Sequence, residues 1–216
     1  FTEEYEARRK SCQISEELEF QTKPQLALEM IENVLEKQFF QFEYILGDSL
    51  YGNSWEFVEG LEKRKLKYFL AVHCTVQFYM SFSEFHKKRK WFKEGSTARI
   101  EVTIGKVVAV EARQLAEELH EGMWQRRKSS EGTKGAIEHE YVRFRVRLKR
   151  NEQKEVWLII KRTLGPNKEY KYFISNAPEQ ESLKKMVVVS GKRWGIEQCF
   201  EEMKSDFLII ATASLH

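Results

Sequence analysis

A strand, a helix and a second strand follow one another between residues 42 and 72, and this order constrains the fold more than any other feature. Phe42–Leu46 is a short apolar and aromatic run that stops at Gly47-Asp48, as a buried strand does at a sheet edge. Asn53 is placed to cap the following helix, and Tyr68–Val72 is a second apolar run. Two strands joined by a helix in this way are expected to be parallel, with a right-handed crossover. The sequence therefore predicts an α/β fold.

Asp48 would lie at the carboxyl end of the first of these strands. In open α/β sheets the loops at that edge open into a crevice, where ligands and reacting groups gather. Taken alone, an aspartate in this position is more often a capping or turn residue than a metal ligand. Both interpretations of Asp48 therefore stay open on the local sequence.

The remaining sequence divides by its hydrophobic periodicity. No sustained period is present from Phe1 to Phe20, which we expect to be irregular, whereas the apolar residues of Pro24–Lys37 recur at the spacing of an amphipathic helix. Alternating β-branched and aromatic residues predict a β-rich insertion, and helical spacing returns over Gly191–Phe207. We accordingly expect three segments, with part of an α/β core in residues 1–73, the insertion in residues 74–175, and a closing helix with its tail in residues 176–216.

One strand of the expected insertion carries a row of positive charges. A period of two places Arg143, Arg145, Arg147 and Lys149 on one face and apolar residues on the other. Such a row fits a DNA phosphate backbone, but an ordinary solvated face explains it equally well. A second basic and aromatic cluster, Lys87–Lys93, has the same two explanations.

Composition excludes several classes of protein. The 36 Lys and Arg residues nearly balance the 33 Asp and Glu residues, so the net charge of +3 indicates no partner by itself. No apolar run approaches the roughly 18 residues of a membrane span, and we expect no membrane partner. The three widely spaced cysteines favour reduced thiols in a cytoplasm over a disulfide framework. The histidines have no metal-ligand spacing, and the chain has no Walker loop.

The last predicted helix brings three charged residues onto one face. Arg193, Glu197 and Lys204 are separated by four and seven residues, which puts them within about 40° of one another around the helix axis. A neighbouring apolar arc would hold this helix against the sheet, so that Glu197 could approach Asp48. The ordinary alternative is an exposed ion pair between Glu197 and Arg193, which contributes under about 1 kcal/mol.

Two separated motifs, in this order, resemble those of bacterial insertion-sequence DDE transposases of the cut-and-paste group. Arg193-Trp194-Gly195-Ile196-Glu197, continuing to Lys204, is similar to their Y-x2-R-x3-E-x6-K signature, with Ser190 at the tyrosine position. Gly47-Asp48-Ser49-Leu50-Tyr51-Gly52 resembles their second-aspartate segment, and Gly132-Thr133-Lys134-Gly135 resembles a Gly-x-Lys-Gly loop of their insertion. The resemblance spans roughly residues 20–207.

The resemblance implies an incomplete RNase H-like domain, in which a mixed sheet with flanking helices carries a β-rich insertion between the second aspartate and the glutamate. It implies that Asp48 and Glu197 are catalytic and bind Mg²⁺ or Mn²⁺, with two ions in the complete site. Double-stranded DNA is the implied partner, at element ends and at the target, and the intact protein could form a homodimer. The implied DNA contacts are Arg193, Lys204, Ser190, Lys134, Arg143, Arg145 and Arg147.

The family's first catalytic aspartate belongs to a strand that would precede Phe1, and residues 207–216 match nothing in the family pattern. We therefore expect a fragment, truncated at both ends and inactive alone, of an enzyme that cleaves DNA and joins strands. Two other functions remain open at this point. One is a catalytically dead remnant that binds DNA without metal, and the other is an RNase H-like nuclease that cuts without joining strands.

Overall fold

The computed structural model describes residues 3–13, 15, 19–38, 41–80, 109–132 and 135–193. The chain separates into two compact units, Phe1–Gln41 and Phe42–His216. The first unit contains α1 (Glu3–Ser11) and α2 (Lys23–Lys37). The predicted amphipathic helix is α2, which begins with a capping box between Thr22 and Gln25.

The expectation of irregular structure up to residue 20 is wrong for the α1 range. This helix has no apolar stripe for periodicity to detect, and its described side chains are exposed or half-buried. Pairs of opposite charge four residues apart support such a helix locally, and the ion pair between Glu4 and Arg8 is one of them.

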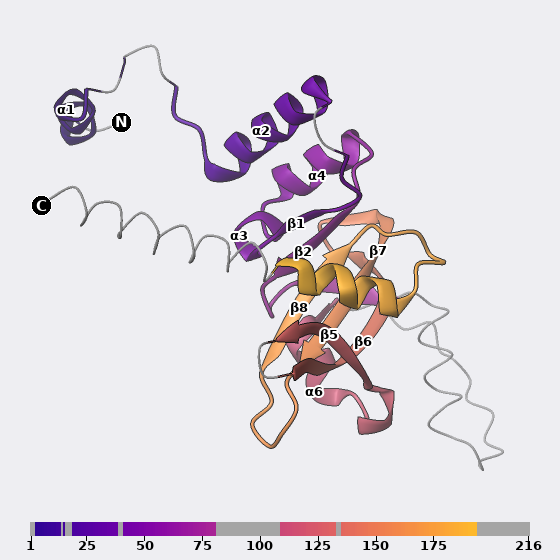
Figure 1. Ribbon diagram of the computed structural model, residues 1–216. Helices are drawn as coiled ribbons and strands as arrows, with labels where there is room; N and C mark the ends of the chain where they lie inside the picture. Colours follow the sequence, from indigo (N-terminus) through magenta and orange to yellow (C-terminus); the bar gives the residue numbers. More distant parts are fainter. Residues whose placement is uncertain are drawn as a thin grey trace, which may run out of the picture. The chain divides into compact units, whose positions relative to one another are not determined.

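The described strands of the second unit build one mixed sheet in the order β1-β2-β8-β7-β6-β3-β4, with β5 paired to β6 (Figure 1). A further helix spans residues 183–193. The remaining elements, in chain order, are β1 (Ile45–Gly47), α3 (Ser49–Gly52), α4 (Trp55–Lys63), β2 (Tyr68–Val72), β3 (Gln77–Met80), β4 (Val110–Glu111), α6 (Ala112–Glu118), a 3₁₀ turn (Glu121–Met123), β5 (Gln125–Gly132), β6 (Gly135–Leu148), β7 (Asn151–Arg162) and β8 (Tyr170–Ser175).

The predicted strand–helix–strand unit is present, and its two strands are parallel. Leu46 of β1 pairs with Phe69 of β2. On its other side β2 pairs antiparallel with β8, so that Phe69 also faces Ser175. Strands from before and after residue 74 therefore share one sheet. The predicted α/β fold with a mixed sheet and flanking helices is confirmed, and it is consistent with an RNase H-like domain.

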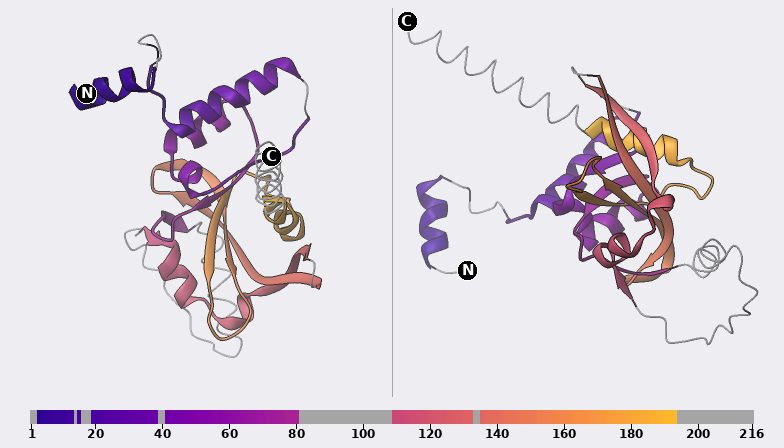
Figure 2. Two further views of the ribbon diagram at one scale, coloured as in Figure 1. Left: turned by 60° about the vertical axis from the view of Figure 1, so that its left-hand side comes forward. Right: turned by 90° about the horizontal axis from the view of Figure 1, so that it is seen from below.

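Helices cover both faces of this sheet. Figure 2 (left) shows α6 on one side of the sheet and the helix of residues 183–193 on the other. The alternation of side chains along the strands supplies an apolar surface to each helix layer. The core beneath the helix of residues 183–193 combines Phe69, Trp157, Ile159 and Phe173 with Leu183, Met186 and Val187.

The Gly47–Gly52 segment packs unusually close to β2. A Cβ atom on Gly52 would lie 1.9 Å from the carbonyl oxygen of Ala71, and one on Gly47 would lie 2.8 Å from a side-chain carbon of Leu70. Both glycines of this motif therefore have a packing role. The next helix, α4, is capped by Ser54, whose hydroxyl accepts from Phe57 N, and the predicted cap at Asn53 is wrong by one residue.

We expect Gly52→Ala to destabilise the protein by about 2 kcal/mol or more, because the clash is with backbone and relief requires α3 to move away from β2. Leu50→Ala is the matched control, since Leu50 is exposed in the same short helix. Urea unfolding of both variants tests the prediction, and equal midpoints would contradict it.

Candidate functional site

Asp48 lies at the carboxyl end of β1, as its sequence position predicts, and its side chain is exposed. One carboxylate oxygen, Oδ1, accepts a hydrogen bond of 2.9 Å from the backbone N–H of Leu50 and so caps α3. Within the described part of the chain, the other oxygen, Oδ2, makes no hydrogen bond or ion pair. The carboxylate therefore has a capping role and still presents an oxygen that could bind a cation.

Asn53, predicted from its position to be only a helix cap, joins the α3 turn to the end of β2. Its Nδ2 donates to the carbonyl oxygen of Ser49 at 2.6 Å, and its Oδ1 accepts from the backbone N–H of His73 at 3.2 Å. Its own carbonyl oxygen accepts from Arg150 at 3.3 Å. These contacts fix the turn that carries Asp48 against the neighbouring parallel strand. A turn-forming asparagine has no sequence signal that would distinguish this role.

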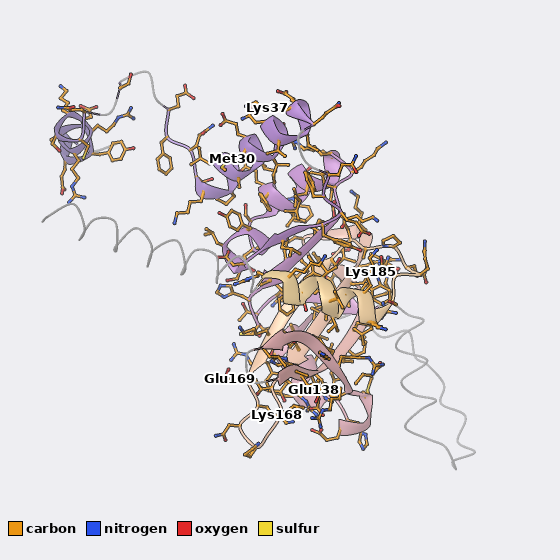
Figure 3. All side chains as sticks on the ribbon, viewed as in Figure 1. Met30, Lys37, Glu138, Lys168, Glu169 and Lys185 are labelled. Carbon is orange, nitrogen blue, oxygen red and sulfur yellow. The ribbon has the colours of Figure 1, made fainter. Side chains whose placement is uncertain are left out.

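The helix of residues 183–193 runs toward the sheet edge on which Asp48 lies. Near its start, Lys185 (labelled in Figure 3) forms an ion pair of 2.5 Å with Glu43, just before β1. Five residues further on, Ser190 lies near the hydroxyl of Tyr141 on β6. The pairings across β7 and β8 put Tyr141 at the same level of the sheet as His73, the residue after β2. The direction of this helix is therefore from the amino end toward the carboxyl end of β1. Arg193 is half-buried at its last described turn.

The basic row of β6 has the alternation that the sequence predicts, but it faces the helix layer. The Arg143 guanidinium lies 4.1 Å from the centre of the Trp157 ring and donates to the carbonyl oxygen of Glu181. It also contacts the sulfur of Met186 at 3.6 Å. Arg143 thus connects β6 to the segment that begins the covering helix.

Arg145 and Arg147 converge on one acidic residue of the adjacent strand. Arg145 lies 3.8 Å from the Glu155 carboxylate and 5.1 Å from the centre of the Trp157 ring, and its side chain is 18% exposed. Arg147 lies 3.4 Å from the same carboxylate and is 55% exposed. Along this row, accessibility to a large ligand therefore increases from Arg143 to Arg147.

Three predicted site residues, Glu197, Lys204 and Lys134, lie outside the described residues. So does the basic cluster at residues 87–93. Gly132 and Gly135, on either side of Lys134, pair with each other as the last residue of β5 and the first of β6. The described ranges contain no cluster of three or more His, Cys, Asp or Glu side chains suited to a metal ion.

The model of one protein family, described as DDE superfamily endonuclease, matches residues 1–136. This range includes Asp48, α3, α4 and the parallel pair β1–β2. No curated protein matches the chain. Among the helices in the described ranges, none combines the length and apolar character required to cross a membrane.

We expect Arg143→Gln to lower the urea midpoint clearly more than Arg147→Gln. The first change removes a cation packed on Trp157 and a hydrogen bond to a backbone carbonyl, losses of roughly 1–3 kcal/mol together. The second removes an exposed ion pair that contributes at most about 1 kcal/mol. A larger loss for Arg147→Gln would contradict the arrangement of this row.

Proposed function

The chain belongs to the DDE superfamily endonucleases, and we propose that it is the catalytic part of a DNA transposase of the cut-and-paste insertion-sequence group. In this function the protein cleaves DNA at the ends of a mobile element and joins the freed strand to a target. The family membership supports endonuclease chemistry on DNA. The Y-R-E-K pattern at Ser190, Arg193, Glu197 and Lys204 is the argument for the transposase group.

The observation that carries the proposal is the position of Asp48. Its carboxylate follows a strand paired in parallel with β2, so it lies at the edge where α/β sheets collect reacting groups. The helix of residues 183–193 runs toward the same edge. Glu197 itself lies outside the described residues, and the proposal assigns it to the metal site beside Asp48 on the sequence pattern.

Nucleases of this superfamily generally use divalent metal ions, and the donors proposed here suit Mg²⁺ or Mn²⁺. Asp48 and Glu197 would supply the carboxylate oxygens that these hard cations prefer. Two bound ions would activate the attacking oxygen and stabilise the leaving one. Carboxylates held about 4 Å apart repel by roughly 4 kcal/mol at an effective dielectric constant of 20, so the cations would also stabilise the site.

DNA would bind along the basic residues beside this edge. We assign phosphate contacts to Arg193, Lys204, Ser190 and Lys134, and to the β6 row at its accessible end, Arg147. Arg143 and Arg145, which are packed on Trp157, would contribute mainly by holding that surface in place. A dimer would bring two element ends together.

We expect Asp48→Asn to abolish Mg²⁺-dependent cleavage of DNA by the protein that contains this chain. Asparagine is as good a helix cap as aspartate, so the substitution removes the metal ligand while leaving α3 capped. Glu169→Gln, at an exposed position in the β7–β8 connection, is the control and should retain activity. Retained cleavage by Asp48→Asn would refute the assignment of Asp48.

A readout that does not depend on turnover complements this assay. Bound Fe²⁺ cuts the polypeptide next to its ligands in the presence of peroxide, and we expect a cut near Asp48 that excess Mg²⁺ suppresses. The Asp48→Asn protein should lose this cut and the Glu169→Gln protein should keep it. An unchanged cut in the Asp48→Asn protein would contradict metal binding by Asp48.

The capping bond from Leu50 to Asp48 favours a second candidate, a protein that binds DNA but has no catalytic metal site. On that alternative, duplex binding would depend strongly on salt, need no divalent cation and be unaffected by Glu197→Gln. We expect instead that chelating the divalent cations abolishes cleavage. Cleavage that persists in excess chelator would remove the metal from the proposed function.

A further inference from the structure

Two lysines stand directly opposite each other on neighbouring strands of the sheet. Lys161 of β7 pairs in register with Lys171 of β8 and, on its other side, with Tyr141 of β6. Residues paired in this way lie on the same face of a sheet, with Cβ atoms roughly 5 Å apart. His139, two residues before Tyr141, belongs to that face as well.

This arrangement places positive charges together, and no carboxylate among the described residues pairs with them. Like charges directly opposite each other destabilise a sheet. Burial and the charge of Lys171 lower the pKa of Lys161 to about 8, and no acidic group contributes to that shift. Burial, Lys161 and Lys171 lower the pKa of His139 to about 4. Among the described residues, neither lysine has an ion-pair partner.

Tyr141, the residue paired with Lys161 on β6, carries a buried hydroxyl group. Tyr141 is 0% exposed, and its hydroxyl makes no hydrogen bond within the described residues. Burial raises the pKa of Tyr141, and the hydroxyls of Ser129 and Ser190 lie close enough to oppose that rise, although neither is in hydrogen-bonding geometry. A buried donor without a partner is unfavourable, so a ligand that accepts its hydrogen bond would be stabilised.

The lysine pair lies at the sheet edge that carries Asp48. The pairing of Val72 with Tyr172 puts Lys171 level with the residue that follows β2. Asp48 follows β1, Lys171 is two strands away on β8, and Lys161 is three strands away on β7. With strands about 4.8 Å apart, Asp48 and the two lysines are separated by roughly 10–15 Å. A few nucleotides, at about 3.4 Å of rise each, span that distance.

We propose that the ammonium groups of Lys161 and Lys171, together with the Tyr141 hydroxyl, form a phosphate-binding site. The two cations would supply charge, and the hydroxyl would supply a hydrogen-bond donor. Ser129 and His139 border the site on the β5–β6 side. A backbone phosphate of DNA is the ligand we assign; that source rests on the proposed function, whereas the site itself does not.

The test of the site uses inorganic phosphate and the full chain. NMR titration at constant ionic strength, balanced with chloride, should give saturable shifts of the Tyr141 ring and lysine side-chain signals. Lys161→Gln with Lys171→Gln should raise the phosphate Kd about tenfold or more, a change of about 1.4 kcal/mol or more. Lys184→Gln, which removes one exposed charge from the covering helix, should leave Kd unchanged. Shifts that do not saturate, or equal Kd values in all variants, would overturn the proposal.

Two further measurements test whether the lysines act in folding and whether DNA is the source of the bound phosphate. The double variant should keep or raise the urea midpoint, because it removes a repulsion; a lower midpoint would mean that the lysines act in folding and would overturn the proposal. Its duplex DNA binding should have a salt slope smaller by about 2, one unit for each lost contact, while Lys184→Gln keeps the slope. Lost phosphate binding with an unchanged DNA slope would support the anion site and overturn DNA as its ligand. Failure of the proposed endonuclease function would appear separately, in the Asp48→Asn assay.

Discussion

The pairing of β2 with β8 is the contact on which the rest of the second unit depends. Without it, the parallel pair β1–β2 and the antiparallel strands β7, β6 and β3 would be separate sheets. Side chains reinforce the junction: the Ser175 hydroxyl, buried, donates to Tyr68 O at 2.7 Å, and Asn176 accepts from Tyr68 N and donates to Leu66 O, both at 2.9 Å. The junction positions Asp48 relative to the lysine pair, because β1, which precedes Asp48, and β8, which carries Lys171, both pair with β2.

Two neighbouring residues of β7 illustrate how this protein treats buried positive charge. Arg162 is 2% exposed, stacks on Trp124 at 4.0 Å, and forms ion pairs with Glu121 and Glu140. Burial alone would raise the pKa of Glu140, but hydrogen bonds from Lys168 and Arg162 lower it on balance. Lys161, which points to the opposite face, has no such partner among the described residues. A structural cation in this sheet is thus neutralised by its own chain, and the contrast is what makes the lysine pair a candidate for an external anion.

The sequence predicted those features that follow from local periodicity. The Pro24–Lys37 helix, the Tyr68–Val72 strand, its parallel pairing with β1 and the alternation of Arg143 with Phe144 were all accessible, because each depends on residues close together in the chain. The partners of Arg143 were not, since Trp157 and Glu181 come from other elements that only the fold brings near. For the same reason, the Lys161–Lys171 pair could not be predicted from the sequence. Each is a single lysine near apolar residues, and only the register of β7 and β8 places the two opposite each other. Asp48 and Ser190 were selected by pattern, and their roles stay predictions.

The junction between β2 and β8 also bears on how the chain reaches its native state. Ser175 and Tyr68, which it joins, are 107 residues apart. The entropy of closing so long a loop must be overcome before the contact contributes, whereas β6 and β7 meet through the tight connection at Lys149-Arg150. Loop closure therefore favours early formation of the β6–β7 hairpin over formation of the β2–β8 junction. Until the junction forms, β1 can pair only with β2, so the sheet edge that carries both Asp48 and the lysine pair is completed only when distant parts of the chain meet.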